Sequence, residues 1–207
     1  MQNQQILHFL EQEIVPRYDA HDAGHQRDHA HYVMETSLRL AEYYPEVDQN
    51  MLLVAAAYHD LGLCEGRKLH HVVSARIISE DKRLLQWFTP EQIEVIADAA
   101  EDHRASSDHE PRTIYGRIIA EADRQIEGDT IIRRTIQYTQ AHYPGLDYDQ
   151  QYQRFIEHMA EKYAEGGYLK LWIPESPNAV RLAKFRELLK QPQVLKQRYD
   201  EIYASLL

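Results

Sequence analysis

One segment of the chain is so apolar that it has few structural options, and it ends in two polar residues. Residues 51–58 read Met-Leu-Leu-Val-Ala-Ala-Ala-Tyr, and His59 and Asp60 follow directly. Because a helix that is apolar on every side is normally buried, this segment is predicted to carry an imidazole and a carboxylate into a poorly solvated place. A buried carboxylate without a partner is costly. Two explanations follow: a bound metal cation that satisfies both groups, or a helix end where both groups cap neighbouring backbone.

The composition favours a helical domain. The chain has 207 residues, of which 43% are hydrophobic, and only 8 are Gly and 8 are Pro. This is enough apolar material for a core, and the scarcity of helix-breaking residues favours helices. The most strand-like segment, residues 168–173, has only a weak period-two pattern. We therefore predict an all-α, single-domain helical bundle, with its core at about residues 18–127 and an outer helical layer at about 128–207.

Apolar spacing and the residues that start and stop helices predict where the helices lie. The expected helices are 2–15, 29–44, 49–61, 70–81, 90–103, 113–127, 129–142, 147–165 and a C-terminal set that begins near Ser176 and Pro177. Pro16 is expected to end the first helix, and Thr89 is expected to cap the helix that Pro90 begins.

Charge and cysteine content limit the classes of partner. The formal net charge is −10, which opposes a protein that grips a nucleic acid polymer through its phosphates. It does not oppose a small phosphorylated substrate, because a metal ion can invert the local field. Cys64 is the only cysteine, and neither a secretory signal nor an apolar run of membrane length is visible. We expect a cytoplasmic protein without a membrane partner, whose acidic surface and 14 tyrosines permit a homodimer.

Three further predicted helices each turn one ligand-type residue toward the core. His29 lies four residues before Val33 on the apolar face of its helix. His103 and Asp123 each lie on an apolar stripe at helical spacing. The two stripes consist of Ile93, Ile96 and Ala100, and of Tyr115, Ile119, Ala122 and Ile126. One inward histidine is usually a hydrogen-bonded core residue, but three of them with two inward carboxylates indicate a metal site.

Three segments together resemble the HD-domain superfamily of metal-dependent phosphohydrolases. They are residues 24–33, Gly-His-Gln-Arg-Asp-His-Ala-His-Tyr-Val, residues 57–62, Ala-Tyr-His-Asp-Leu-Gly, and residues 120–124, Ala-Glu-Ala-Asp-Arg. Their order and spacing fit the pattern of that superfamily, which is a histidine, then adjacent His-Asp, then a distant Asp. The resemblance implies an HD-type fold in which a first metal is held by His29, His59, Asp60 and Asp123.

Two more segments extend the resemblance. Residues 70–75, His-His-Val-Val-Ser-Ala, and residues 101–104, Glu-Asp-His-Arg, are similar to segments that help hold a second ion in HD proteins with two metals. This implies His70 and His103 as second-metal ligands, although helical phase does not separate His70 from His71. The layout is most similar to a bacterial branch that includes nucleotide pyrophosphohydrolases. That branch often has Asp-Arg-Leu-Asp-Ala where residues 123–127 here read Asp-Arg-Gln-Ile-Glu.

Metal chemistry then predicts the activity. Mixed imidazole and carboxylate ligands disfavour Ca²⁺, and we expect one or two divalent ions among Mn, Fe, Mg, Co, Ni and Zn. Such an ion lowers the pKa of a bound water and polarises a phosphoryl group. The expected protein is a metal-dependent phosphohydrolase, a phosphomonoesterase or nucleotide pyrophosphohydrolase, with His59 and Asp60 at the reaction centre. Arg104 is predicted either to hold a phosphate through two hydrogen bonds or to be a solvated helix-end charge.

Other interpretations stay open from the sequence. An HD-fold di-iron oxygenase needs both metal sites filled with iron, and a non-catalytic metal or nucleotide sensor needs binding without turnover. His25 is predicted to donate a proton, to bind substrate or to bond backbone in a loop. Asp22, Asp28 and Asp102 are predicted to orient ligand imidazoles through hydrogen bonds.

Overall fold

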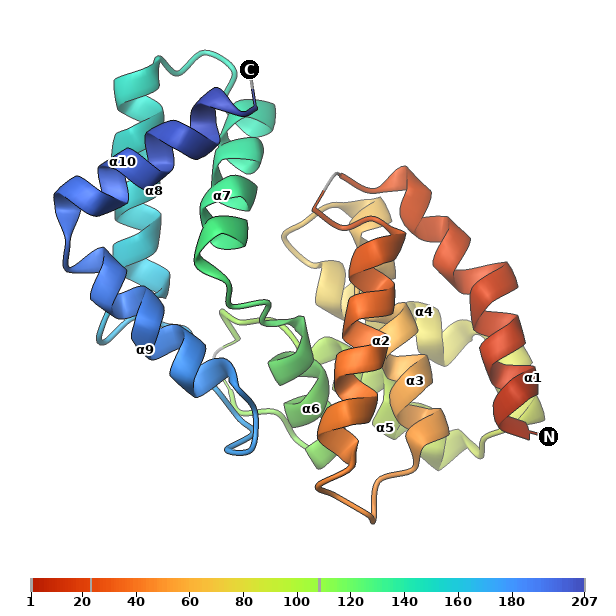
Figure 1. Ribbon diagram of the computed structural model, residues 1–207. Coiled ribbons are helices and arrows are strands. Elements are labelled where there is room, and N and C mark those ends of the chain that lie inside the picture. The colour runs from red at the N-terminus through yellow and green to blue at the C-terminus, as the bar shows by residue number, and fades with distance from the viewer. Residues whose placement is uncertain (1, 23, 108, 207) are drawn as a thin grey trace. The chain divides into compact units, whose positions relative to one another are not determined.

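The computed structural model describes residues 2–22, 24–107 and 109–206, and in these ranges it is helical without any strand (Figure 1). The predicted all-α class is confirmed. Residues 168–173, the most strand-like segment, form no strand. Within the same ranges, none of the helices has the length and apolar character needed to cross a membrane.

The chain divides into two compact units. The first comprises Met1–Arg124 and Trp172–Ser176, and the second comprises Gln125–Leu171 and Pro177–Leu207. The division falls close to the boundary predicted between core and outer layer, and the single-domain organisation stays a prediction. The elements of the first unit are α1 (Gln2–Phe9), η1 (Leu10–Ile14), η2 (Val15–Ala20), α2 (Arg27–Ala41), α3 (Gln49–Tyr58), η3 (Leu61–Glu65), α4 (His70–Glu80), η4 (Lys82–Gln86), α5 (Pro90–Glu101) and α6 (Ile114–Asp123).

Helix α3 forms the centre of the first unit. It packs against α2, α5 and α6, and every residue from Met51 to Tyr58 is buried, as its uniform apolar character predicts. Asp48 caps the start of α3 by accepting hydrogen bonds from the backbone N–H groups of Asn50 and Met51. The helix therefore delivers His59 and Asp60, which follow its last turn, into the interior of this unit.

Gly62 fixes the position of α4 relative to the end of α3. Its backbone N–H donates to Ser74 Oγ at 2.9 Å. A Cβ atom on Gly62 would lie 2.0 Å from the His70 carbonyl oxygen and 2.7 Å from the Ser74 nitrogen. Only a residue without a side chain permits this approach. The close packing brings the first turn of α4, with His70, next to the His59-Asp60 pair.

Several helix bounds differ from the sequence prediction by a few residues, and two of the differences have a clear bearing on the site, whereas the start of α5 agrees. The helical course continues past Pro16 as η2, because a proline in a first turn removes no needed hydrogen bond. Helix α6 ends at Asp123, four residues earlier than the predicted end at 127. Thr89 and Gln92 form the reciprocal capping contacts that begin α5, as predicted.

The second unit is a group of four helices, which are drawn in green to blue in Figure 1. They are α7 (Gly128–His142), α8 (Tyr148–Lys162), α9 (Asn178–Leu189) and α10 (Pro192–Ala204). Helix α7 packs against α8 and α10, and α10 also packs against α9. The buried apolar residues of this unit include Ile132, Phe155, Phe185 and Tyr199.

Candidate metal centre

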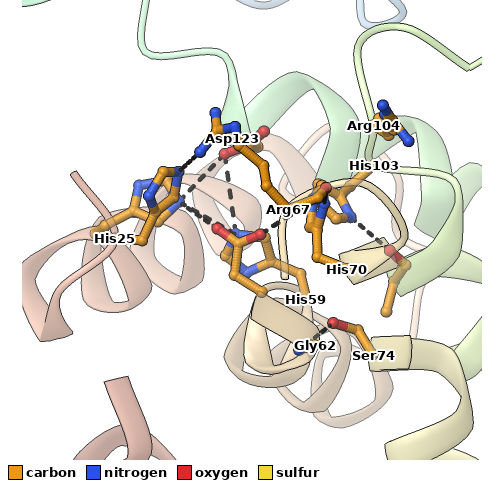
Figure 2. A network of polar contacts seen from close by, with 12 residues as sticks. His25, His59, Gly62, Arg67, His70, Ser74, His103, Arg104 and Asp123 are labelled. Atoms are coloured by element: carbon orange, nitrogen blue, oxygen red, sulfur yellow. Dashed lines mark hydrogen bonds and ion pairs between the residues drawn. The ribbon is translucent and has the colours of Figure 1, made fainter. Parts of the chain in front are cut away.

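The ends of three helices bring four predicted ligands together in the first unit. His29 lies in the first turn of α2, His59 and Asp60 follow α3, and Asp123 is the last residue of α6. Each of these residues offers one ligand atom, and the four atoms lie within 4.8 Å of one another (Figure 2). Residues from three separate helices thus meet in one cluster.

A second group shares Asp60 with the first. His70, in the first turn of α4, and His103, just after α5, turn their Nε2 atoms toward each other at 3.1 Å. Asp60 Oδ1 lies 3.5 Å from His70 Nε2 and 3.4 Å from His103 Nε2. The other oxygen, Asp60 Oδ2, lies 3.2 Å from His59 Nε2. The two carboxylate oxygens therefore face two different groups of imidazoles.

Backbone carbonyl groups orient three of the four imidazoles. The Nδ1 atoms of His59, His70 and His103 lie 2.7, 2.7 and 2.5 Å from carbonyl oxygens. The accepting residues are Ala56, Arg67 and Ala100 respectively. Since Nδ1 carries the proton in such a bond, Nε2 points into the centre as a lone pair unless a second proton binds.

The carboxylates that the sequence suggested for this orienting role have other contacts. Asp102 binds Arg112, with Oδ1 2.8 Å from Nη2, and Asp22 accepts from His25 Nδ1 at 2.8 Å. Asp28 is exposed in the first turn of α2. Helical periodicity reports which side chains face inward, but it does not report which backbone carbonyl a ring will reach. The three carbonyl acceptors therefore lay outside what the sequence predicted.

The centre attracts positive charge. Burial opposes charge on His29, yet hydrogen bonds to Asp123 and Asp60 raise its pKa to about 9. Burial also opposes charge on His103, and the hydrogen bond to Asp60 raises its pKa. Burial opposes ionisation of Asp60 as well, but electrostatic attraction to His59 and hydrogen bonds to His103, His29 and His59 hold the pKa of Asp60 well below its ordinary value. Ligand atoms that converge in this way suit a divalent ion, which satisfies several of them at once.

The separations of the ligand atoms suit a single small ion in the first group. Ligands held about 2.1 Å from an octahedral ion lie about 3.0 Å apart when adjacent and about 4.2 Å apart when opposite. His29 Nε2 lies 3.2 Å from Asp123 Oδ1, and His59 Nε2 lies 3.9 Å from the same oxygen. His29 Nε2 and His59 Nε2 are 3.2 Å apart. The donor set is nitrogen and oxygen, which suits first-row divalent metals.

Arg104 lies beside the centre and holds a loop. Its Nη1 donates to the Lys68 carbonyl oxygen at 2.5 Å, and its Nε donates to Ser106 Oγ at 2.9 Å. These bonds tie the segment before α4 to the segment after α5. The predicted contact of Arg104 with a substrate phosphate stays a prediction.

Tyr18 helps to position His59 and Asp60, a role that the sequence did not indicate. It is fully buried, its hydroxyl donates to the Ala57 carbonyl oxygen at 3.0 Å, and it accepts from the Asp60 backbone N–H at 3.3 Å. The bonds fix the turn that carries His59 and Asp60. Tyr18 lies in η2, beyond the proline expected to end the first helix, so periodicity gave no reason to place it in the core.

Comparison with protein families agrees with this geometry. The family described as HD domain matches residues 21–125, slightly more than half of the chain, and the match includes all six predicted ligands. The chain belongs to the HD domain family, in which members bind divalent metals and metal-dependent hydrolases are found. No curated protein and no solved structure matches the chain.

Proposed function

We propose that this protein is a metal-dependent phosphohydrolase that acts on a small phosphorylated substrate. The observation that carries the proposal is the position of Asp60, whose Oδ2 faces His59 and whose Oδ1 faces His70 and His103. One carboxylate between two groups of imidazoles is suited to hold two ions side by side. Two ions at about 3.5–4 Å clamp both the attacking and the leaving oxygen of a phosphoryl transfer.

The residues have separate tasks in this proposal. His29, His59, Asp60 and Asp123 hold the first ion, and Asp60, His70 and His103 hold the second. When bound, the ions supply an activated water and polarise the phosphoryl group. The carbonyl groups of Ala56, Arg67 and Ala100 keep three ring nitrogens aimed inward. The His59 side chain is fully buried, whereas Asp123 is 26% exposed, so substrate reaches the centre from the Asp123 side.

A nucleotide is the substrate class that we propose. The support is the resemblance to the branch that includes nucleotide pyrophosphohydrolases, together with a net charge of −10 that disfavours a polymeric nucleic acid. The sequence at residues 123–127 departs from that branch.

The test measures release of phosphate and pyrophosphate from a panel of nucleoside monophosphates and triphosphates with added Mn²⁺. Wild type is compared with His59→Ala and with a matched control, His31→Ala, whose half-buried ring lies away from the centre and contacts Glu11. We expect His59→Ala to lose release by at least about a hundredfold, as losses of transition-state stabilisation of about 2.7 kcal/mol do. The control is expected to stay within about twofold of wild type.

Other outcomes separate the alternatives. Absence of release from protein that is shown to hold Mn²⁺ would contradict nucleotide hydrolysis. Iron-loaded, coloured protein that consumes oxygen would instead support the di-iron oxygenase, and tight nucleotide binding without turnover would support a sensor.

A further inference from the structure

An arginine that the sequence analysis did not single out, Arg67, lies along the solvent-accessible side of the metal centre. Arg67 is exposed and follows Gly66, whose φ of +103° turns the chain between η3 and α4. Its carbonyl oxygen accepts from His70 Nδ1 at 2.7 Å, while its Nη1 lies 3.5 Å from His25 Nε2. Figure 2 shows the side chain extending from the His70 side of the ligand cluster toward His25 and Asp123. Arg67 thus contacts one ligand, His70, through its carbonyl group, and His25 through its side chain.

His25 is itself held in a defined orientation. Its Nδ1 lies 2.8 Å from Asp22 Oδ1, which also accepts from the Gly24 backbone N–H at 2.8 Å. The hydrogen bond from His25 lowers the pKa of Asp22 to about 2, so Asp22 is an acceptor at neutral pH. With the proton on Nδ1, His25 Nε2 is an acceptor that faces an Arg67 N–H donor. Asp22, His25 and Arg67 form a directed chain of hydrogen bonds.

The hydrogen-bond chain from Asp22 through His25 to Arg67 ends on the side of the centre from which a substrate enters. The side chains of Asp123 and His70 are 26% and 12% exposed, whereas that of His59 is fully buried. The ring of His25 stands edge-on to the ring of His29, with centroids 5.6 Å apart, which places His25 beside the first group of ligands. The Arg67 guanidinium, which lies beside His25, is therefore at the rim of the centre on its accessible side.

The charge balance of the metal centre indicates a task for the Arg67 guanidinium. Two carboxylates, Asp60 and Asp123, cancel the charge of one divalent ion or half the charge of two, and the protein as a whole carries −10. A phosphoryl group with two or three anionic oxygens is therefore further stabilised by a cation on the side that faces solvent. A guanidinium suits this task because it is always charged and its planar fork matches two phosphate oxygens.

We propose that Arg67, aimed by His25 and Asp22, is an oxyanion clamp that binds the phosphoryl oxygens facing away from the metal ligands. This inference rests on the proposed function and deepens it by naming the residue that positions the substrate. His25 and Asp22 are positioning residues that act through Arg67. The clamp predicts that the site recognises the phosphoryl group itself, before any contact with the rest of the substrate.

The experiment titrates inorganic phosphate into the Mn²⁺-loaded protein by calorimetry. It compares wild type with Arg67→Gln, Arg67→Lys and a control, Arg76→Gln. Arg76 is an exposed arginine on α4 that pairs with Glu65. We expect Arg67→Gln to bind phosphate about tenfold to a hundredfold more weakly, as loss of a charge-assisted hydrogen bond does. Arg67→Lys is expected to lie between Arg67→Gln and wild type, because a single ammonium cannot replace the fork.

Bound Mn²⁺ is counted in the same samples and is expected to be unchanged in Arg67→Gln. The substitution retains the carbonyl oxygen that orients His70, so a change in phosphate affinity at constant metal content isolates the side chain. Asp22→Asn and His25→Gln are expected to weaken phosphate binding by a smaller factor than Arg67→Gln. With a hydrolysed substrate, the same variants are expected to raise KM more than they lower kcat.

Two results would overturn the clamp. One is wild-type phosphate affinity in Arg67→Gln with full Mn²⁺ content. That result would contradict the clamp but would not contradict the proposed phosphohydrolase function. The other is absence of phosphate binding to Mn²⁺-loaded wild type. Hydrolysis is measured separately with the nucleotide panel, so failure of the clamp and failure of the proposed function give different patterns. Folding of each variant is checked by thermal unfolding.

Discussion

His70 Nε2 lies 3.1 Å from His103 Nε2, although the two residues are 33 positions apart in the chain. Both rings bond a backbone carbonyl through Nδ1, and burial together with the charge of His103 lowers the pKa of His70 to about 4. At neutral pH, His70 therefore presents an unprotonated nitrogen to its partner. This pair is the half of the candidate centre that distinguishes a two-ion site from a one-ion site.

Replacing His70 or His103 with Ala is expected to remove the second ion and to leave the first. The first group of ligands does not include either residue, so elemental analysis of Mn²⁺-reconstituted protein should fall from two ions to one per chain. Asp60→Asn is expected to weaken both sites, because its two oxygens face both groups. Two ions retained in His70→Ala would contradict the assignment of the second group.

Removing the metal is expected to lower thermal stability as well as activity. A ligand that binds only the folded state stabilises it by about 2.7 kcal/mol at a concentration one hundred times its Kd. For a chain of this size, that corresponds to a fall in Tm on the order of 5–10 °C on chelation. Calorimetry with and without a chelator measures the shift, and His59→Ala should show a much smaller one. An equal shift in His59→Ala would place the stabilising ion elsewhere.

Gly62→Ala is expected to disturb the second site more than the first. The added Cβ would meet backbone atoms of His70 and Ser74, which cannot rotate away. Forcing a methyl group into packed surroundings costs about 1–3 kcal/mol, and the strain displaces the turn that carries His70. Gly145→Ala is the matched control, since nothing lies within 4 Å of its added Cβ. Thermal unfolding and metal content are measured for both, and equal behaviour of the two variants would refute this role of Gly62.

Asp81 is expected to make stability depend on pH in the acid range. Burial opposes its ionisation, but hydrogen bonds from Arg83 and Tyr58 lower its pKa below the ordinary value of 3.8. Its contribution is therefore fully present above about pH 4 and is lost as pH falls through the lower pKa of the folded state.

Asp81→Asn tests this by denaturant unfolding at several pH values. At pH 7 we expect a loss of about 1.5–3 kcal/mol, the usual range for a hydrogen bond to a charged group. The difference from wild type should shrink toward pH 2, where the native carboxyl also begins to take up a proton. Asp149→Asn, at an exposed position, serves as the control. A loss that is equally large at every pH would contradict the role of the Asp81 charge.

Much of the fold followed from patterns within single segments. The uniform apolar run before His59 required burial, and the structure buries every residue from Met51 to Tyr58. Capping at Thr89 and the apolar stripes that contain His103 and Asp123 are local features, because they depend on spacing along one helix. Pro16 misled the prediction, since a proline is compatible with the first turn of η2.

The sequence by itself determined the helical class and the residue types that converge on one centre, because helical phase states which side chains face inward. It did not determine which groups hold those side chains in place. Each carbonyl acceptor lies three residues before the histidine that it orients. The Gly62 contact with α4 and the reach of Arg67 toward His25 join separate segments of the chain. Periodicity carries no information on such contacts, because they depend on how separate helices pack. Only the tertiary structure decided them.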